Sequence, residues 1–273
     1  MRLGAPVFEF TTPDQWVAAH REAGYGACYW PTESEGQEDA YLQAAREAGL
    51  VVAEVGAWSN PMSPDAVQRA TAIENCKAKL ALAERVGARC CVNITGSLGY
   101  RWDGPDARDL TDEAFDQIVV TTRQIIDAVK PSRTFYALET MPWAYPDSAD
   151  SYLRLLAAID RKSAGVHLDP VNLVNCPARY FRTDLLLREC FAKLGPRIRS
   201  CHAKDVLLAP KLTVHLDEVA PGLGKLDYAT FLRELSRLDA DTTLMIEHLQ
   251  PQEYPPAAAH IRKVAQDCGL AFA

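Results

Sequence analysis

The fold of this chain is decided by four stretches of its second half: FYALETMPW (135–143), AGVHLDPVN (164–172), IRSCHAKDV (198–206) and TLMIEHL (243–249). Each stretch contains a short apolar run of strand length together with an acidic or imidazole side chain. Similar apolar runs occur in the first half, and a segment with helical periodicity follows each run. We therefore predict eight strands, at residues 3–9, 26–30, 50–57, 89–95, 134–139, 164–169, 198–203 and 243–248.

Local signals mark the ends of the predicted helices. Thr12-Pro13-Asp14 predicts a helix start, because Thr caps a helix and Pro is favoured at its first position. Ser63-Pro64-Asp65 repeats this signal before a long helix, which we expect to end at Gly87. Thr111-Asp112-Glu113 begins another helix, and Lys130-Pro131 closes it.

Eight strand–helix units in 273 residues average about 34 residues each, which suits a strand, a helix and two loops. Alternating strands and helices indicate a parallel sheet covered by helices. The alternative is an open doubly wound sheet, but no GxGxxG phosphate loop follows the first strand. No linker or low-complexity tract divides the sequence. We therefore predict an α/β fold with a single (β/α)8 TIM-barrel domain over residues 1–273.

Composition excludes several classes of protein. The chain is 48% apolar and 24% charged, which is ordinary for a soluble globular protein. Its net charge of −7 argues against a nucleic-acid partner, and no apolar run approaches the ~20 residues of a membrane-spanning helix. The eight cysteines are scattered without a CxxC, as expected for small buried side chains in a reducing compartment. We expect a cytoplasmic protein with no membrane partner.

Four consecutive predicted strands each carry one metal-ligating side chain near their carboxyl end, where barrel enzymes place their chemistry. These side chains are Glu139, Asp169, His202 and Glu247, separated by 30, 33 and 45 residues. One such residue alone would be an ordinary solvated glutamate or buried histidine. Four in phase on successive strands indicate a divalent-metal site, since three buried carboxylates would otherwise repel one another.

The segments ALET, GVHLD, CHAKD and MIEH, in that order, resemble the sugar phosphate isomerase/epimerase superfamily of xylose-isomerase-like TIM barrels. Relatives include the ketose 3-epimerases, hydroxypyruvate isomerase and inosose dehydratase. The resemblance implies that Glu139, Asp169, His202 and Glu247 bind one divalent metal ion, with manganese favoured over magnesium, cobalt or zinc. It further implies an isomerase or epimerase for which a small polyhydroxylated carbonyl compound, a carbohydrate or its derivative, is the substrate.

In such enzymes proton transfer occurs alpha to a carbonyl through a metal-held enediolate. The resemblance assigns Glu139 and Glu247 as the acid and base of this transfer. The sequence departs from the ketose 3-epimerases at two positions. Asn172 stands where they have a histidine, and Leu208 stands where they have a substrate-binding arginine. We still expect Asn172 to bind substrate.

Other residues are candidates for substrate binding. His167 should face the same way as Asp169, and Lys204 the same way as His202, because side chains alternate along a strand. Either could instead be a buried residue bonded within the barrel. Glu54 lies inside an apolar strand, so it needs a partner such as Lys204 or a substrate hydroxyl.

Aromatic residues and one long loop complete the predicted mouth. Trp58 and Trp143 follow strands, where their rings could stack on the apolar faces of a sugar or pack against a partner subunit. Loop 206–226 is long for a strand–helix connection, which makes it a candidate lid. Gly222 and Gly224 in this loop permit close backbone approach. The long loops and the aromatic rim are compatible with a homodimer.

Three alternatives to an isomerase remain open. The same site could serve a lyase, as in inosose or dehydroshikimate dehydratases or enzymes that cleave C-glycosides, because loss of a β-leaving group follows the same enolate. An enzyme like endonuclease IV uses many histidine ligands, whereas this chain has six histidines and a negative charge. A non-catalytic sugar-binding barrel is the third alternative, but all four ligand residues are present.

Overall fold

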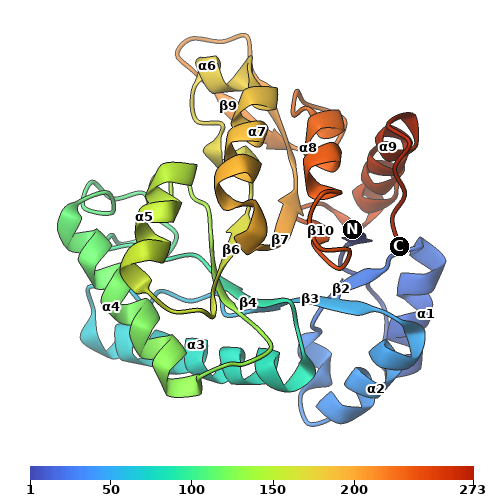
Figure 1. The fold of residues 1–273 in the computed structure, drawn as a ribbon, viewed down its shortest axis with the longest axis horizontal. Helices are drawn as coiled ribbons and strands as arrows, with labels where there is room; N and C mark the ends of the chain where they lie inside the picture. The colour runs from blue at the N-terminus through green and yellow to red at the C-terminus, as the bar shows by residue number, and fades with distance from the viewer.

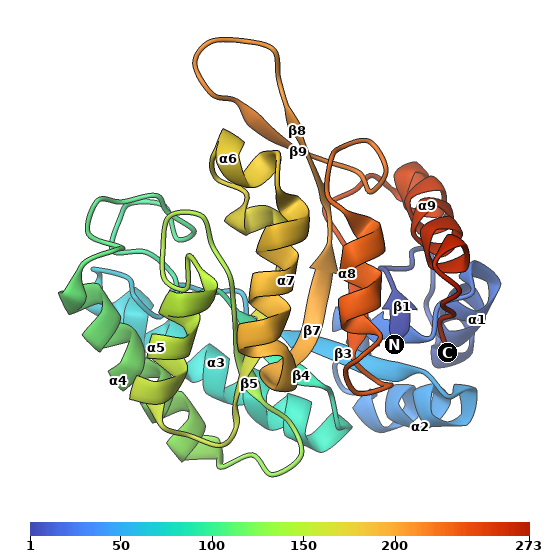
Figure 2. The same ribbon diagram turned by 45° about the horizontal axis from the view of Figure 1, so that its top comes forward.

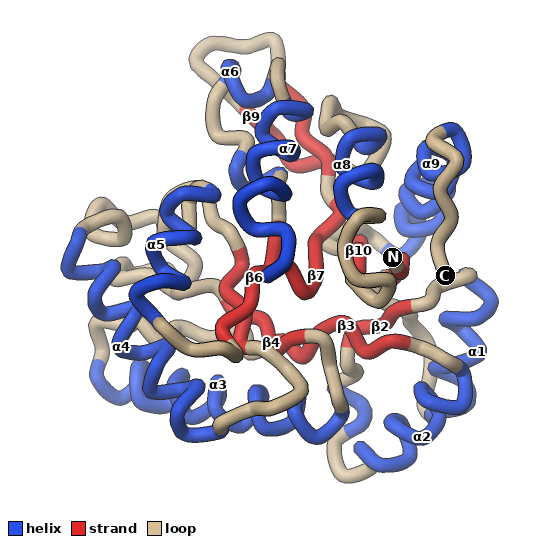
Figure 3. The backbone as a smooth tube through the Cα atoms, viewed as in Figure 1, coloured by secondary structure: helices blue, strands red, loops and turns tan.

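Eight parallel strands form a closed barrel in the computed structural model, which describes residues 1–273. The strands lie at the centre of the molecule and the helices surround them (Figure 1, Figure 3). The order around the barrel is β1-β10-β7-β6-β5-β4-β3-β2, so the first and last strands pair and leave no free edge. The barrel strands are β1 (Arg2–Gly4), β2 (Ala27–Tyr29), β3 (Val51–Gly56), β4 (Cys90–Asn93), β5 (Tyr136–Glu139), β6 (Ala164–Leu168), β7 (Ile198–Ala203) and β10 (Thr243–Ile246).

This arrangement confirms the predicted TIM barrel. None of its helices combines the length and the apolar character needed to cross a bilayer. The helices are α1 (Pro13–Ala23), α2 (Glu38–Ala48), α3 (Ala66–Val86), α4 (Asp112–Val129), α5 (Ala149–Ile159), α6 (Pro177–Tyr180), α7 (Thr183–Leu194), α8 (Tyr228–Leu235) and α9 (Tyr254–Asp267), with single 3-10 turns at η1 (Thr32–Ser34), η2 (Val171–Leu173), η3 (Gly195–Arg197) and η4 (Pro251–Glu253).

Most of the predicted helix ends are confirmed. Thr12 and Thr111 each accept a hydrogen bond from a backbone N–H of the first turn, and Gly87 ends α3 with a φ of 73°. The start of α3 was predicted wrongly. Asp65 caps this helix by accepting from the N–H of Gln68, so Ser63-Pro64 lies before the helix rather than at its first position.

Seven of the eight predicted strands are shorter in the structure than in the sequence pattern, and β1 and β10 show why. β1 ends at Gly4 rather than at residue 9, and Pro6 has no N–H to donate to a neighbouring strand. β10 ends at Ile246, and His248 turns away from the strand with a φ of 58°. This positive φ is uncommon for a residue other than glycine, and it redirects the chain just after Glu247.

The interior of the barrel is polar at its centre. Most apolar side chains pack between the sheet and the helices, but Glu54, His167, Ser200, His202 and Thr243 are buried within the barrel. They form a connected chain of hydrogen bonds, in which Thr243 Oγ1 donates to Ser200 Oγ at 2.7 Å and Ser200 donates to Glu54. TIM barrels usually fill this space with branched apolar side chains. The polar chain leads directly to the carboxyl ends of β5, β7 and β10.

The predicted lid at 206–226 contains a hairpin that the sequence pattern did not reveal. Strands β8 (Asp205–Leu208) and β9 (Leu216–Val219) pair antiparallel and project beyond the barrel at the top of Figure 2. Leu212 at the tip is almost fully exposed. The hairpin continues β7 after Lys204, so it rises directly from the carboxyl end of a barrel strand.

Asp205 fastens the base of this hairpin. Its buried carboxylate accepts four backbone N–H groups, from Val206 at 2.9 Å, Gly222 at 3.0 Å, Gly224 at 3.1 Å and Leu226 at 2.8 Å. A Cβ on Gly224 would lie 2.3 Å from Asp205 Oδ1, so only glycine permits this approach. The two glycines therefore do allow the close backbone approach that the sequence predicted.

We predict that Asp205→Ala lowers the free energy of unfolding by about 3 kcal/mol, because several buried N–H groups lose a charged acceptor. Asp205→Asn should cost about 2 kcal/mol, since an amide NH2 would face backbone donors. Urea denaturation measures both losses, and Asp217→Ala on the exposed face of the hairpin is the control. A loss no larger than that of the control would contradict the role given to Asp205.

Candidate metal centre and active site

Glu139, Asp169, His202 and Glu247 meet at one point above the barrel interior. One ligand atom from each side chain lies within 4.8 Å of the others. Nδ1 of His202 is the centre of the group, at 3.2 Å from Glu139 Oε1, 2.8 Å from Glu247 Oε1 and 3.8 Å from Asp169 Oδ2. The four residues are contributed by the ends of β5, β6, β7 and β10, so the rigid sheet fixes their positions.

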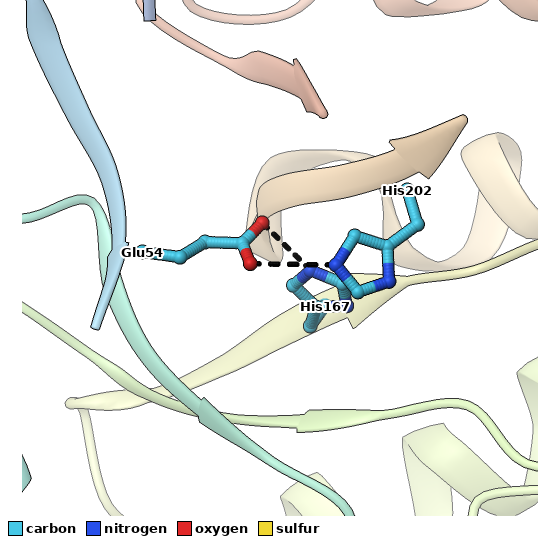
Figure 4. A group of neighbouring side chains, drawn as sticks. All are labelled: Glu54, His167 and His202. Carbon is cyan, nitrogen blue, oxygen red and sulfur yellow. Dashed lines mark hydrogen bonds and ion pairs between the residues drawn. The ribbon is translucent and has the colours of Figure 1, made fainter. Parts of the chain in front are cut away.

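The opposite side of the His202 ring faces Glu54. Nε2 of His202 lies 3.4 Å from Glu54 Oε2, and Nε2 of His167 lies 2.9 Å from Glu54 Oε1 (Figure 4). The two imidazoles also contact each other with a centroid distance of 4.1 Å and an interplanar angle of 69°. Glu54 is therefore the common acceptor for both histidines, and its partners differ from the expected Lys204.

Glu54 and His167 lie beneath the ligand group, not on the wall of the cavity above it. Both side chains are completely buried. Glu54 belongs to the middle of β3 and points into the barrel, and His167 lies on β6 directly behind His202. Their placement does not support the expectation that they contact substrate. We infer instead that they orient His202, as carboxylates commonly do for metal-binding histidines.

Lys204 lies on the same side of its chain segment as His202, as side-chain alternation predicted. Its Nζ contacts Glu247 Oε1 at 2.6 Å, Asp169 Oδ2 at 2.9 Å and Glu218 Oε2 at 3.4 Å. Burial lowers the pKa of Lys204, but the surrounding carboxylates outweigh burial and raise that pKa well above its usual value. The side chain is therefore a fixed ammonium group at the wall of the site.

Asn172 lies on the 3-10 turn η2 and contacts the same group of residues. Its Nδ2 donates to Glu139 Oε1 at 3.2 Å and to the carbonyl of Thr140 at 3.1 Å. Asp169 fixes this turn, because its Oδ1 accepts the N–H of Val171 at 2.9 Å and that of Asn172 at 3.3 Å. One oxygen of Asp169 thus holds the loop while Oδ2 points toward His202 and Lys204.

The donors present fit a divalent metal ion. Asp169 Oδ2 and Glu247 Oε1 are buried, and their neighbours are the ammonium group of Lys204, at 2.9 and 2.6 Å, and Nδ1 of His202, at 3.8 and 2.8 Å. A divalent ion bound between these oxygens would add positive charge at the point where three carboxylates converge. Three carboxylates and one imidazole are ligands that Mn²⁺, Mg²⁺, Co²⁺ and Zn²⁺ accept. The ligand set predicted from the sequence is therefore assembled in space.

The charges in the group compensate one another closely. Burial lowers the pKa of His202, but Glu247 and Glu139 hold this pKa well above its usual value. Burial raises the pKa of Glu247, whereas the charges of His202 and Lys204 lower it to about 2. A proton on His202 Nδ1 thus occupies the place where the carboxylates favour a cation. A metal ion bound there would replace this proton.

A cavity of about 460 Å³ opens above the ligand group at the barrel mouth. Its size is typical of sites for small ligands. Trp58 and Trp143 line it, at 45% and 38% exposure, as do Lys204 and Asn172. Glu218 and His248 also line the cavity, and neither is among the site residues predicted from the sequence. The other lining residues are Tyr29, Ile94, Trp102, Asp103, Glu139, Met141, Pro142 and Glu247.

Glu218 was missed because its position depends on the hairpin. It lies on β9, where it contacts Lys204 and also accepts from His248 Nδ1 at 3.1 Å. Glu218 raises the pKa of His248 against the effect of burial. His248 directly follows Glu247 in the sequence, so its position near the site could have been predicted. No sequence pattern placed Glu218 near β7 or β10.

A family model described as xylose isomerase-like TIM barrel matches residues 2–265. The chain belongs to this family. The match covers all four ligand-bearing strands and confirms the resemblance drawn from the sequence motifs. No curated protein matches the chain in sequence.

Three solved structures of this fold are similar over almost the whole chain. The probable 3-DHS dehydratase AsbF from Bacillus anthracis, involved in petrobactin synthesis, has a TM-score of 0.73 and 19% identity, covering 97% of this chain and 98% of its own. The E. coli 3-keto-D-glucoside 4-epimerase YcjR has a TM-score of 0.69 and 16% identity, with coverages of 96% and 99%. A xylose isomerase-like TIM barrel protein from Mycobacterium smegmatis, in complex with magnesium, has a TM-score of 0.67 and 15% identity, with coverages of 93% and 87%. At these identities the similarity shows the fold.

We predict that Glu54→Gln weakens metal binding about 10- to 100-fold, because the carboxylate that faces His202 Nε2 is lost. The readout is the dissociation constant of Mn²⁺, measured by electron paramagnetic resonance titration. Glu113→Gln on the exposed start of α4 is the matched control, and thermal unfolding verifies that both variants fold. Unchanged Mn²⁺ affinity in a folded Glu54→Gln protein would exclude the orienting role.

Proposed function

We propose that the protein is a divalent-metal-dependent isomerase or epimerase acting on a carbohydrate or a carbohydrate derivative. One observation carries this proposal. Glu139 and Glu247 reach the same point from β5 and β10, with Oε1 of each within 3.2 Å of His202 Nδ1, and both line the mouth cavity. Two carboxylates converging on one small volume can remove a proton from a substrate carbon and return it at another position.

Glu139, Asp169, His202 and Glu247 would hold the metal ion. When bound, the ion would act as a Lewis acid that polarises the substrate carbonyl, which makes the neighbouring C–H more acidic. Manganese is the ion we favour, with magnesium, cobalt and zinc as alternatives. The magnesium complex of the related M. smegmatis protein supports a divalent ion in this fold.

The remaining residues position the substrate in this proposal. Lys204 offers an ammonium group beside Glu247, which stabilises negative charge that develops on a substrate oxygen. Asn172 restrains Glu139 through its 3.2 Å hydrogen bond, and its Oδ1 can accept a hydrogen bond from a substrate hydroxyl. Trp58 and Trp143 present flat apolar surfaces on which the C–H face of a sugar can pack.

A lyase is the second candidate, and the similarity to the probable dehydratase AsbF favours it. Both reactions begin with removal of a proton next to a carbonyl. They diverge when a hydroxyl on the β-carbon leaves instead of a proton returning. The same residues, Glu139 and Glu247, would remove the proton and protonate the leaving group. The distinction therefore depends on the substrate rather than on the ligand group.

We predict that the Mn²⁺- or Mg²⁺-loaded protein incorporates deuterium from D₂O at a carbon next to a carbonyl. Nuclear magnetic resonance follows the exchange over a panel of ketoses, inososes and 3-keto-sugars. Glu139→Gln and Glu247→Gln should each slow exchange by at least about 100-fold, because each removes a proton-transfer group. Isomers in the product spectrum identify an isomerase or epimerase, and an unsaturated ketone identifies a lyase.

Mn²⁺ binding by each variant is measured in parallel, since both glutamates are also proposed ligands. Exchange that stops while the metal still binds supports the acid–base role. Exchange that continues unchanged in both variants would contradict it. A wild-type protein that binds metal but exchanges no member of the panel would contradict the proposed chemistry for these substrates.

A further inference from the structure

The wall of the mouth cavity carries more carboxylates than basic groups. Glu139, Glu247, Glu218 and Asp103 line it, whereas Lys204 and His248 are its only basic side chains. No arginine lines the cavity. Arg101 lies nearby on the same loop as Asp103, but it pairs with Asp103 at 3.0 Å and its side chain is 69% exposed.

Both basic side chains are already paired. Lys204 lies within 3.4 Å of oxygens from three carboxylates, those of Asp169, Glu247 and Glu218. His248 lies 3.1 Å from Glu218. A divalent ion and the Lys204 ammonium would together only balance the three carboxylates of the ligand group. An incoming anion would therefore find no unpaired cation in the cavity.

Leu208 of the hairpin does not line the mouth cavity. It lies at the end of β8 and faces a different cavity, which Tyr180, Phe181 and Pro210 also line. The hairpin thus contributes one acidic side chain to the mouth, Glu218, and no basic one. The negative charge that the hairpin adds to the mouth is therefore separate from the four residues of the ligand group.

We propose that the substrate is an uncharged polyhydroxylated carbonyl compound, and that Glu218 on the hairpin excludes phosphorylated and carboxylated analogues. This inference rests on the proposed function and specifies its substrate class. A phosphate or carboxylate would lose its hydration and face Glu218 or Asp103 without a compensating partner. Hydroxyl groups, in contrast, can donate to these carboxylates. The exposed rings of Trp58 and Trp143 can pack against the C–H groups of such a substrate.

The pair formed by Glu218 and His248 is the element that sets this preference. His248 adopts a φ of 58°, and this uncommon conformation places its ring at the rim, where Nδ1 meets Glu218. Glu218 contacts Lys204 with its other oxygen, Oε2, at 3.4 Å. Glu218 therefore forms an ion pair with each of the two basic side chains of the rim. Replacing Glu218 by lysine would remove this carboxylate from both His248 and Lys204 and add a third basic group to the rim.

The test compares matched pairs of ligands that differ only by a phosphate: D-fructose with D-fructose 6-phosphate, and D-xylulose with D-xylulose 5-phosphate. Saturation-transfer nuclear magnetic resonance titrations on the Mg²⁺-loaded protein give a dissociation constant for each ligand without requiring turnover. We expect the neutral member to bind at least tenfold more tightly. In Glu218→Lys we expect this ratio to fall by at least tenfold, and in Glu218→Gln by a smaller factor.

Asp217→Lys is the matched control, because it makes the same change of charge on the neighbouring residue of β9, whose side chain points to the opposite face. It should leave the ratio nearly unchanged. Phosphate esters that bind the wild type as tightly as the neutral ligands would overturn the inference. An equal shift in Asp217→Lys would overturn the role of Glu218, because a general field effect would then account for it.

The outcome is separable from that of the exchange experiment. A neutral preference without deuterium exchange would support the charge selectivity and contradict the proposed proton transfer. Exchange with the phosphate esters in place of the neutral sugars would support the proton transfer and contradict the selectivity. Absence of binding by every ligand of both pairs would contradict the substrate class itself.

Discussion

The imidazole of His202 lies between two sets of carboxylates, and the arrangement of the site depends on this position. Glu54 faces Nε2 from inside the barrel, while Glu139, Asp169 and Glu247 surround Nδ1 from the mouth. A buried ring with acceptors on both sides has a fixed orientation and a fixed distribution of protons. The strands that carry these residues must keep their register, because a shift of one residue would turn every side chain to the other face.

This arrangement requires polar side chains at the centre of the barrel. Glu54, Ser200 and Thr243 replace the apolar side chains that normally fill a TIM barrel, and each is stable there because hydrogen bonds connect it to the next. The apolar core between sheet and helices supplies the stability that this centre does not. The chain of polar groups continues through His202 to Glu139 at the barrel mouth, so the polar centre and the candidate metal site are connected.

The sequence predicted much of the fold and the ligand group because both depend on local periodicity. An apolar run followed by Glu139, Asp169, His202 or Glu247 is visible in the chain, and closure of the barrel brings equivalent strand ends together. The predictions failed where contacts are non-local. The partners of Glu54 come from strands more than 100 residues away, and no periodicity shows which buried residue it will meet.

The barrel, the four candidate ligands at the strand ends and the glycines that approach Asp205 follow from the sequence, because side-chain alternation and capping act over a few residues. Only the folded chain brings Glu54 to the ring of His202 and Glu218 to the mouth cavity. Glu218 reaches Lys204 only because β8 and β9 fold into a hairpin that returns to β7. Its position is a consequence of chain path in three dimensions, which residue types and spacing do not encode locally.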